Sequence, residues 1–202
     1  MKKEMKLIGL TGTIASGKST AAAYLTARYG LPVLDLDQVN REVLAEEAVK
    51  AKLRETFGDG VFAADGSVDR AALAAVVFAD GARKKQLTDI SWPVIVEKCE
   101  DWIRARREAG ASACAVEAID LLKTSLGEAA DEIWVVFAPP GERVRRMCEN
   151  RKMTEDEARA RMASQWPDEE YLARADRVLY SGGSLARLYR DCRRAYRRLR
   201  RK

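Results

Sequence analysis

The sequence of 202 residues contains no histidine. This absence excludes histidine general bases, catalytic triads that use one, and histidine metal ligands. Cysteine is scarce as well, and no two of the four cysteines form a C-x-x-C pair. Reduced thiols in a cytoplasm fit such a scattered set better than a disulfide framework or a zinc site does. We therefore expect a cytoplasmic protein with reduced thiols at Cys99, Cys114, Cys148 and Cys192.

Long apolar stretches are also missing. No run approaches the roughly 20 apolar residues that cross a bilayer, and the first apolar run is too short for the core of a signal peptide. We therefore expect no membrane partner.

The net charge of +5 does not describe the whole chain. Residues 185–202 hold eight arginines and one lysine against the single Asp191, a charge of +8 that leaves −3 for residues 1–184. Because the basic residues are confined to one end, the body of the protein does not look like a nucleic-acid binder. Nucleic acid is thus an unlikely partner, and this basic segment is the one hint of it.

A glycine-rich segment follows the apolar residues 7–10 and matches the phosphate-loop pattern G-x-x-x-x-G-K-[ST] at every fixed position. The glycines allow a loop that curls around an anion with its backbone N–H groups pointing inward. Lys18 can reach the β- and γ-phosphates, and the Ser19 hydroxyl can bind Mg²⁺. Helix formers come next, so the positive end of a helix faces the phosphates. The predicted ATP-binding residues are Gly12, Thr13, Ile14, Ala15, Ser16, Gly17, Lys18, Ser19 and Thr20.

Five short apolar runs lack the alternation of half-buried strands and are separated by helical stretches, which is typical of buried parallel strands. They cover residues 5–10, 32–34, 113–119, 133–137 and 177–180. The pattern predicts an α/β fold, a three-layer, doubly wound, five-stranded parallel sheet with the phosphate loop at the carboxyl end of its first strand.

Helical patterns dominate residues 38–108, with predicted breaks at residues 57–60, at residues 65–67 and at Trp92-Pro93. We interpret this crossover as a helical lobe, over about residues 38–110, that closes over the acceptor. Ser67 or Asp69 can cap one of its helices. Later, a capping box at residues 154–157 opens a helix to about residue 165, and Asp168 is expected to cap a short helix that follows. The whole chain, residues 1–202, is predicted to be a single domain.

Two aspartates, Asp35 and Asp37, follow the second strand and emerge at the same edge of the sheet as the phosphate loop. Strand alternation sends them to roughly the same side. A kinase needs a carboxylate that orients the acceptor hydroxyl and takes its proton, and oxygens near the Mg²⁺ shell. The alternative is that one of the two merely caps the following helix.

With these motifs, the sequence resembles the dephospho-coenzyme A kinase family over nearly all of its length. The members of this family are P-loop kinases related to the nucleoside monophosphate kinases. The phosphate loop is shared by many families, but its combination with the D-x-D pair and a D-G-x-x-D-R block is far more specific. The resemblance is carried by residues 8–20, 33–37 with Arg41, 65–70, 73 with 77–78, 134–136 with 139–140, 157–161 with Gln165, and 175–176.

The resemblance implies transfer of the ATP γ-phosphoryl group to the 3′-hydroxyl of dephospho-coenzyme A, with ATP and Mg²⁺ as cofactors. We also expect a monomer. The resemblance implies that Asp37 is the catalytic base and that Asp35 and Arg41 help to bind the acceptor. A lid over about residues 141–166 would carry Arg145 and Arg146, and we expect Arg146 to stabilise the transferring group beside Lys18.

Several positions depart from the family pattern. Trp92 replaces the usual histidine before proline, and residues 120–124 replace a usual Pro-Leu-Leu-Phe-Glu. Asn150 stands where a lid arginine is familiar, although Arg151 is adjacent, and Tyr180-Ser181 replaces Asp-Asn. ATP binding is therefore the firmer expectation. The alternatives are a related kinase with a different small-molecule acceptor, or a non-catalytic paralogue that binds ATP or coenzyme A.

Two further features have paired interpretations. Asp120 ends an apolar run, where a carboxylate commonly holds Mg²⁺ through water, so we predict that it shares the metal with Ser19; the alternative is a helix N-cap. The C-terminal segment has an apolar stripe at helical spacing, which predicts a helix docked on the sheet with its arginines in water. Its alternative is a contact with RNA or an anionic surface.

Overall fold

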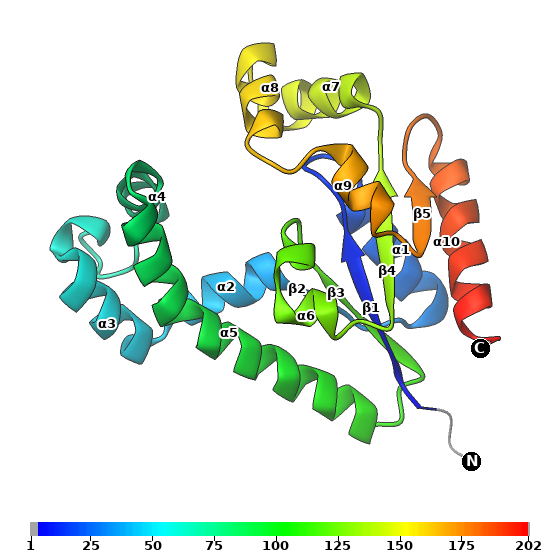
Figure 1. Cartoon of the computed structure of the whole chain (residues 1–202), viewed down its shortest axis with the longest axis horizontal. Helices are drawn as coiled ribbons and strands as arrows, with labels where there is room; N and C mark the ends of the chain where they lie inside the picture. The colour runs from blue at the N-terminus through cyan, green and yellow to red at the C-terminus, as the bar shows by residue number, and fades with distance from the viewer. Residues whose placement is uncertain (1–3, 202) are drawn as a thin grey trace. The chain divides into compact units, whose positions relative to one another are not determined.

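The computed structural model describes residues 4–201 and divides the chain into two compact units (Figure 1). The first unit combines Met1–Leu34 with Arg106–Lys202, and the second is Asp35–Ala105. The bounds of the second unit, residues 35–105, are close to those of the helical lobe predicted over residues 38–110. Its role as an acceptor lobe stays a prediction.

The predicted five-stranded, all-parallel sheet is confirmed. The strand order is β2-β3-β1-β4-β5, and β1 pairs with both β3 and β4. The three central strands, β3, β1 and β4, are almost entirely buried because both faces of the sheet are covered. The bounds of the five strands are β1 Lys6–Thr11, β2 Val33–Asp35, β3 Ala113–Glu117, β4 Glu132–Phe137 and β5 Arg177–Tyr180.

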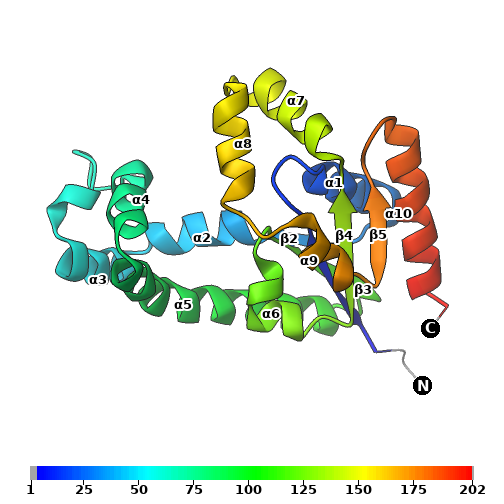
Figure 2. The same ribbon diagram turned by 45° about the horizontal axis from the view of Figure 1, so that its top comes forward.

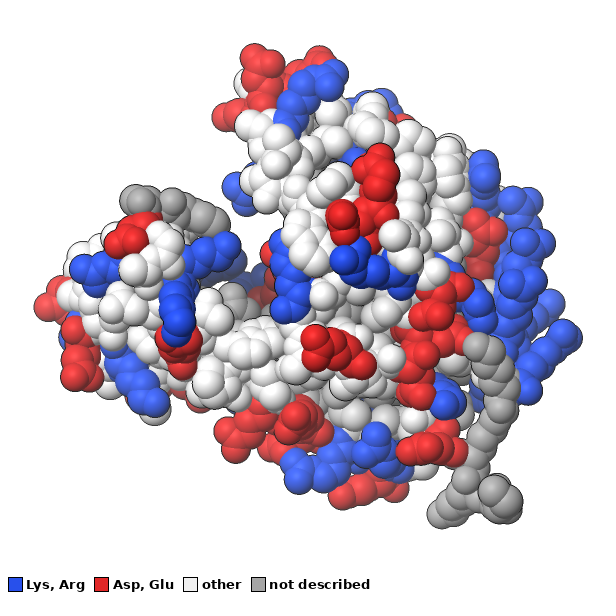
Figure 3. All heavy atoms as spheres, viewed as in Figure 1, with Lys and Arg blue, Asp and Glu red and all other residues white. Residues whose placement is uncertain are grey.

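Helices α1 (Lys18–Tyr29) and α10 (Leu185–Leu199) cover one face of the sheet. Their buried residues form one core with Ile8, Leu10 and Trp134 of the strands. Two stacked tyrosine pairs join the helices, Tyr24 with Tyr189 at 4.1 Å and Tyr29 with Tyr196 at 4.2 Å between ring centroids. The predicted docking of the C-terminal helix is thus confirmed, and its Arg side chains form much of the blue edge of the molecule in Figure 3.

The opposite face is covered by α9 (Asp168–Ala173), whose buried Tyr171 packs with Ile133 and Val135 of β4. The short η2 (Leu121–Lys123) and α6 (Ser125–Glu128) precede β4. Thr124 caps α6 by accepting from the Gly127 N–H. Helices on both faces make the three-layer, doubly wound architecture that the sequence predicts.

Helices α7 (Pro140–Arg151) and α8 (Glu155–Ala163) lie beyond the carboxyl ends of β4 and β5, as the turned view in Figure 2 shows. The capping box of Thr154 and Glu157 that opens α8 is present as predicted. Buried Val144, Met147 and Ala158 of these helices pack on Ile14 of the phosphate loop. The predicted lid segment therefore packs directly on the loop.

The second unit is helical. Asp69, one of the two predicted caps, accepts from the Ala71 and Ala72 N–H groups and so starts α4. The helices are α2 Leu36–Ala45, α3 Glu47–Phe57, η1 Asp59–Val61, α4 Arg70–Ala79 and α5 Gly81–Glu108.

The break predicted at Trp92-Pro93 is wrong, because α5 continues through Pro93 for its full 28 residues. Proline removes one helical hydrogen bond, but buried residues on both sides of it, such as Ser91 and Ile95, hold the helix together. The Ser91 hydroxyl also donates to the Leu87 carbonyl at 2.9 Å in the turn before the proline.

No helix within residues 4–201 is long and apolar enough to cross a membrane. The cysteines are unpaired, as predicted, and three of them are buried; the fourth, Cys148, is partly exposed.

Candidate active site

The phosphate loop connects β1 to α1 and depends on two glycines. Gly12 has φ 143° and Gly17 has φ 101°, conformations that side chains rarely allow. A Cβ at Gly12 would lie 2.3 Å from the Val136 carbonyl oxygen, and one at Gly17 would lie 2.4 Å from the Ser181 hydroxyl. The loop thus fits closely against the ends of β4 and β5, which explains why both positions are glycine.

Lys18 begins α1, and only 9% of it is exposed. Its ammonium group donates to the carbonyls of Gly12 at 3.0 Å and Thr13 at 3.3 Å, so the lysine folds over its own loop. The first backbone N–H groups of a helix have no partner within it, and here they face the loop. The loop therefore presents a cation and backbone donors to the same anion.

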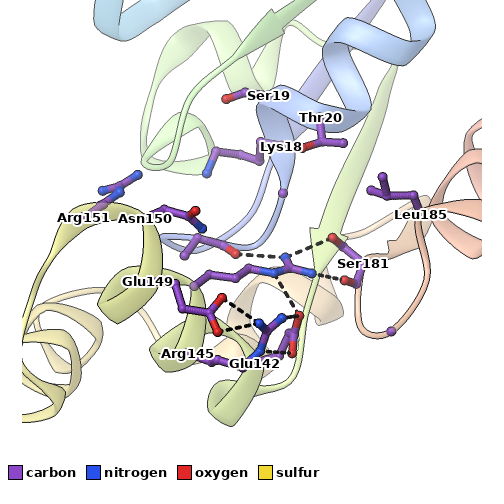
Figure 4. Close-up of a pocket in the computed structure, with 14 residues that line it drawn as sticks. Lys18, Ser19, Thr20, Glu142, Arg145, Glu149, Asn150, Arg151, Ser181 and Leu185 are labelled. Atoms are coloured by element: carbon purple, nitrogen blue, oxygen red, sulfur yellow. Dashed lines mark hydrogen bonds and ion pairs between the residues drawn. The ribbon is translucent and has the colours of Figure 1, made fainter.

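A cleft of about 480 Å³ opens beside the loop, within the first unit (Figure 4). Four cationic side chains line it, against two carboxylates, and both carboxylates are paired with arginines of α7. This volume falls in the range of small-molecule pockets. The lining residues are Ala15, Gly17, Lys18, Ser19, Thr20, Glu142, Arg145, Arg146, Glu149, Asn150, Arg151, Ser181, Gly183 and Leu185.

The arginines of α7 differ in their partners. Arg146 donates to the carbonyls of Ala15 at 3.2 Å and Ser16 at 3.3 Å, and also to Ser181, so it fixes the loop to the end of β5. Arg151 is exposed and has no ion-pair or hydrogen-bond partner among the residues described. Of the lid arginines in the cleft, Arg151 is thus the one available to an incoming anion.

Arg145 bridges the two carboxylates of the cleft, pairing with Glu142 at 2.7 Å and with Glu149 at 2.6 Å. The hydrogen bond from Arg145 lowers the pKa of the Glu142 carboxyl. Both carboxylates are therefore neutralised within α7.

The carboxylate next to Ser19 is Glu117. The Ser19 hydroxyl lies 3.3 Å from its Oε1 atom, and Glu117, at the end of β3, is 9% exposed. Asp120 was predicted to end this strand, but the strand stops three residues earlier. Asp120 instead pairs with Lys123 at 2.6 Å and makes no capping hydrogen bond in η2, so the helix-cap alternative is wrong. Its share of the metal site stays a prediction.

A buried group of side chains ties the loop to α7 and α9. Arg143, 3% exposed, donates to the Thr13 hydroxyl at 2.6 Å and pairs with Asp168 at 2.6 Å. Burial lowers the pKa of the Arg143 guanidinium, and the Asp168 carboxylate opposes this shift. Asp168 is thus not the helix cap that the sequence predicted, because its carboxylate is used by Arg143 and Thr13.

Gln165 provides a second tie, accepting a 2.8 Å hydrogen bond from the backbone N–H of Ile14. Neither this contact nor the hydrogen bond from Arg143 to Thr13 was predicted as part of the site, since in each case the partners are more than 100 residues apart in the chain. The Gln165 in the family motif was the available signal.

The two aspartates after β2 have different roles. Asp35 caps α2 by accepting from the backbone N–H groups of Asp37 at 2.9 Å and Gln38 at 3.2 Å. Helix α2 begins at Leu36, so Asp37 belongs to its first turn and strand alternation does not relate the pair as predicted. The Asp37 side chain is exposed and has no hydrogen-bond or ion-pair partner within the described part of the chain.

Strand β1, a glycine-rich loop and a helix begun by Lys18 and Ser19 define a P-loop nucleotide-binding protein. A model of the dephospho-CoA kinase family matches residues 6–187. The chain belongs to the dephospho-CoA kinase family, and it is accordingly an ATP-dependent phosphotransferase, as the resemblance implied.

Individual relatives match over the same length. A dephospho-CoA kinase of Leifsonia xyli subsp. xyli is 40% identical over 189 residues, which cover 93% of this chain and 95% of that protein. One from Geobacter sulfurreducens is 36% identical and covers 92% and 94%. A crystal structure from Thermus thermophilus superimposes with a TM-score of 0.85 at 35% identity, over 98% of this chain and 99% of that one. The similarity thus includes both units.

Proposed function

We propose that the chain transfers the γ-phosphoryl group of ATP to the 3′-hydroxyl of dephospho-coenzyme A, the last step of coenzyme A synthesis. The observation that carries this proposal is the loop closed by Lys18 at a cleft lined by four cationic side chains. Membership of the dephospho-CoA kinase family supplies the acceptor.

On the donor side, the loop amides of residues 12–20 hold the triphosphate. Lys18 exchanges the carbonyls of Gly12 and Thr13 for phosphate oxygens, which are stronger partners because they carry charge. We propose that Arg151 binds the phosphoryl group during its transfer, because Arg146 already donates hydrogen bonds to the carbonyls of the loop. Arg146 then contributes by keeping the loop in its phosphate-binding form, rather than by contacting the transferring group as the sequence suggested.

Ser19 and Glu117 fit a Mg²⁺ ion, since both offer oxygen atoms and Mg²⁺ prefers oxygen ligands with several waters. Ser19 would bind the ion directly and Glu117 through water, in place of Asp120. When bound, the ion neutralises charge on the β- and γ-phosphate oxygens.

On the acceptor side, Asp37 takes the proton of the 3′-hydroxyl while the oxygen of that hydroxyl forms a bond to the γ-phosphorus. The bond between the γ-phosphorus and the oxygen that bridges it to the β-phosphate breaks, and ADP leaves. The exposed, unpartnered carboxylate supports this role, because a base held in an ion pair would be less available. Asp35 fixes the start of α2, and Arg41 follows Asp37 by one helical turn.

A cytoplasmic location is proposed from the four unpaired thiols, three of which are buried. We also propose a monomeric working form.

The test is an assay of the purified chain with ATP, Mg²⁺ and dephospho-coenzyme A, in which ADP and coenzyme A should form in equal amounts. Lys18→Ala should abolish turnover without unfolding the protein. Asp37→Asn should lower kcat by about a hundredfold or more, the contribution of a general base, with ATP affinity unchanged.

A chain that binds ATP but forms no ADP with this acceptor would refute the proposal and favour a non-catalytic binder. Turnover of Asp37→Asn within a few-fold of wild type would remove Asp37 as the base while leaving the reaction in place.

A further inference from the structure

The C-terminal helix α10 carries a dense row of arginines that the donor cleft does not use. Residues 187–201 contain eight arginines, no lysine and one acidic residue, Asp191. Six of the arginines are exposed on one side of the helix, the last of them in the turn that follows it. We call this set the arginine ridge: Arg187, Arg190, Arg194, Arg197, Arg198 and Arg201.

Helical geometry groups the side chains of the arginine ridge. With about 100° between successive residues, they fall within an arc of about 100°. Buried Leu188, Cys192 and Leu199 lie on roughly the opposite side of the helix. At a rise of about 1.5 Å per residue, the ridge is about 21 Å long. Each strand of a DNA duplex presents a phosphate about every 3.4 Å, so a row of this length can face about six phosphates of a nucleic-acid strand.

The fold leaves most of this charge uncompensated. Arg190 lies 3.9 Å from Asp191, and Arg187 stacks over the Tyr180 ring with its guanidinium carbon 3.7 Å from the ring centroid. Among the described residues, the side chains of the other four ridge arginines have no hydrogen-bond or ion-pair partner. The neighbouring α1 and β5 contain no acidic residue at all. An external anion therefore meets several available guanidinium groups.

The arginine ridge is not explained by the stability of the helix. Like charges three or four residues apart on a helix repel each other, as Arg190 and Arg194 or Arg194 and Arg198 do. The docking of α10 on the sheet uses the opposite, apolar side. A bound polyanion would remove the repulsion, so the ridge is suited to a partner outside the chain.

The chemistry of the ridge favours a nucleic acid over a membrane. A guanidinium group pairs with two phosphate oxygens at once, whereas the ammonium group of lysine acts as a point charge. Residues 1–186 contain eleven lysines beside sixteen arginines, so the exclusive use of arginine is particular to this helix. A helix that lies on a lipid surface inserts its apolar side into the bilayer, and the apolar side of α10 is buried in the protein.

Double-stranded RNA fits the exposed shape best. The tyrosines near the ridge stack in pairs with one another, so they do not offer rings on which unpaired bases could stack. Helix α10 is packed on the sheet along its length, which keeps it from entering a deep groove as helices that read DNA do. Double-stranded RNA is bound mostly through its shape and backbone, and its minor groove is wide and shallow. A straight surface row of arginines can contact that backbone.

We propose that the arginine ridge of α10 is a docking surface for the phosphate backbone of double-stranded RNA, with no preference for base sequence. The buried side of the helix holds it on the sheet, and its exposed side binds the RNA. This role is independent of the proposed phosphotransfer, because no ridge arginine lines the donor cleft.

The test measures binding of the full chain to a fluorescently labelled RNA duplex of about 16 base pairs, the length that double-stranded-RNA domains cover. Fluorescence anisotropy is followed over a series of salt concentrations. The ridge variant replaces three arginines without described partners: Arg194→Gln, Arg197→Gln and Arg201→Gln. The matched control removes three exposed cations elsewhere: Lys52→Gln, Lys84→Gln and Arg107→Gln.

The affinity of the wild type should fall steeply with salt, because each phosphate contact releases counterions. The ridge variant should lose about three units of the slope of log K against log salt concentration, one for each contact. Its affinity at low salt should fall at least about tenfold, while the control stays close to wild type. The Tm and kcat of the ridge variant should not change, since the substituted side chains are exposed and lie outside the cleft. A DNA duplex of the same sequence should bind several-fold more weakly.

Absence of RNA binding at low salt would refute the proposal. Equal losses for the ridge variant and the control would refute the ridge as the docking surface. A DNA duplex that binds as tightly as the RNA duplex would refute RNA as the partner. Displacement of the RNA by vesicles of mixed zwitterionic and anionic phospholipid, at equal phosphate concentration, would refute it in favour of a lipid surface.

Discussion

At the scale of single residues, the Ser19 hydroxyl and the Glu117 carboxylate form the polar pair nearest to the start of α1. The pair is 3.3 Å apart, and Glu117 is buried at the end of a strand. Its carboxylate oxygens lie beside the Ser19 hydroxyl, and oxygen atoms are the ligands that Mg²⁺ prefers. Asp120, by contrast, is exposed and paired with Lys123.

Glu117→Gln should therefore raise the Mg²⁺ concentration for half-maximal activity by about tenfold, the effect of losing an outer-shell partner. The amide keeps the size of the side chain, so the thermal stability should change little. Asp120→Asn is the matched control and should leave the titration unchanged. The measurement is initial rate against Mg²⁺ at fixed ATP; a response from Asp120→Asn alone would restore the original assignment.

The sequence predicted Ser19 and the loop because a local pattern specifies them, with fixed spacing between glycines, lysine and hydroxyl. Glu117 could not be found in the same way, because it meets Ser19 across 98 residues of chain. The local signal is an apolar run followed by an acidic residue. It fits Asp120 as well as Glu117 unless the end of the strand is known.

At the scale of elements, the loop is held by segments that follow β4. Gln165 accepts the Ile14 N–H, Arg143 donates to Thr13, and Ile14 itself packs on α7 and α8. These contacts hold Thr13 and Ile14, which lie in the loop before α1 begins. The predicted lid thus also holds the loop in place, and a substitution in the lid should change how the loop binds the phosphates.

Gln165→Ala should leave the Ile14 N–H without its partner, at a cost of about 1–3 kcal/mol for a buried donor. We expect the KM for ATP to rise several-fold with a smaller change in kcat, because the loop is loosened rather than removed. Gln165→Glu retains an acceptor oxygen and should behave closer to wild type. Steady-state kinetics in ATP give the answer, and equal kinetics for Gln165→Ala and wild type would contradict it.

Helix boundaries show where prediction from local sequence ends. The capping box at Thr154 was predicted correctly, because caps act within a few residues. The break at Pro93 was not, because burial of the residues around it outweighs one missing hydrogen bond. Asp168 has the composition of a cap, yet its carboxylate serves a buried arginine instead.

At the scale of the whole molecule, the first unit depends on its last helix. Leu188, Cys192, Tyr196 and Leu199 of α10 are each at most 8% exposed in the main core. Burial raises the pKa of the Cys192 thiol to about 12. The arginines on the other side of the helix are exposed, which fits the predicted docking with a solvated basic face.

Truncation after Ser184 should therefore unfold the first unit. Losing one large buried side chain costs about 2–5 kcal/mol, and a domain has only about 5–15 kcal/mol in total. Circular dichroism should show no cooperative thermal transition for the truncated chain. The control is Arg194→Ala with Arg197→Ala, two exposed positions whose loss should leave the Tm nearly unchanged. A truncated chain that folds and keeps kinase activity but loses RNA binding would support the alternative role of the basic helix.

The sheet and the family could be predicted from the sequence because the apolar runs and the motifs are local patterns that follow one another along the chain. The two-unit division was foreseen only approximately, since a long helix such as α5 carries no mark of where one unit ends.

The division has a consequence for how the specificity of such an enzyme can change. The second unit is a continuous insertion, whereas the P-loop cleft is built from the two flanking segments alone. Recombination or a mutation library confined to residues 35–105 would vary Asp37 and the helices around it without altering any residue of the donor cleft. If Asp37 is the base as proposed, such changes alter the choice of acceptor while the ATP cleft is inherited intact.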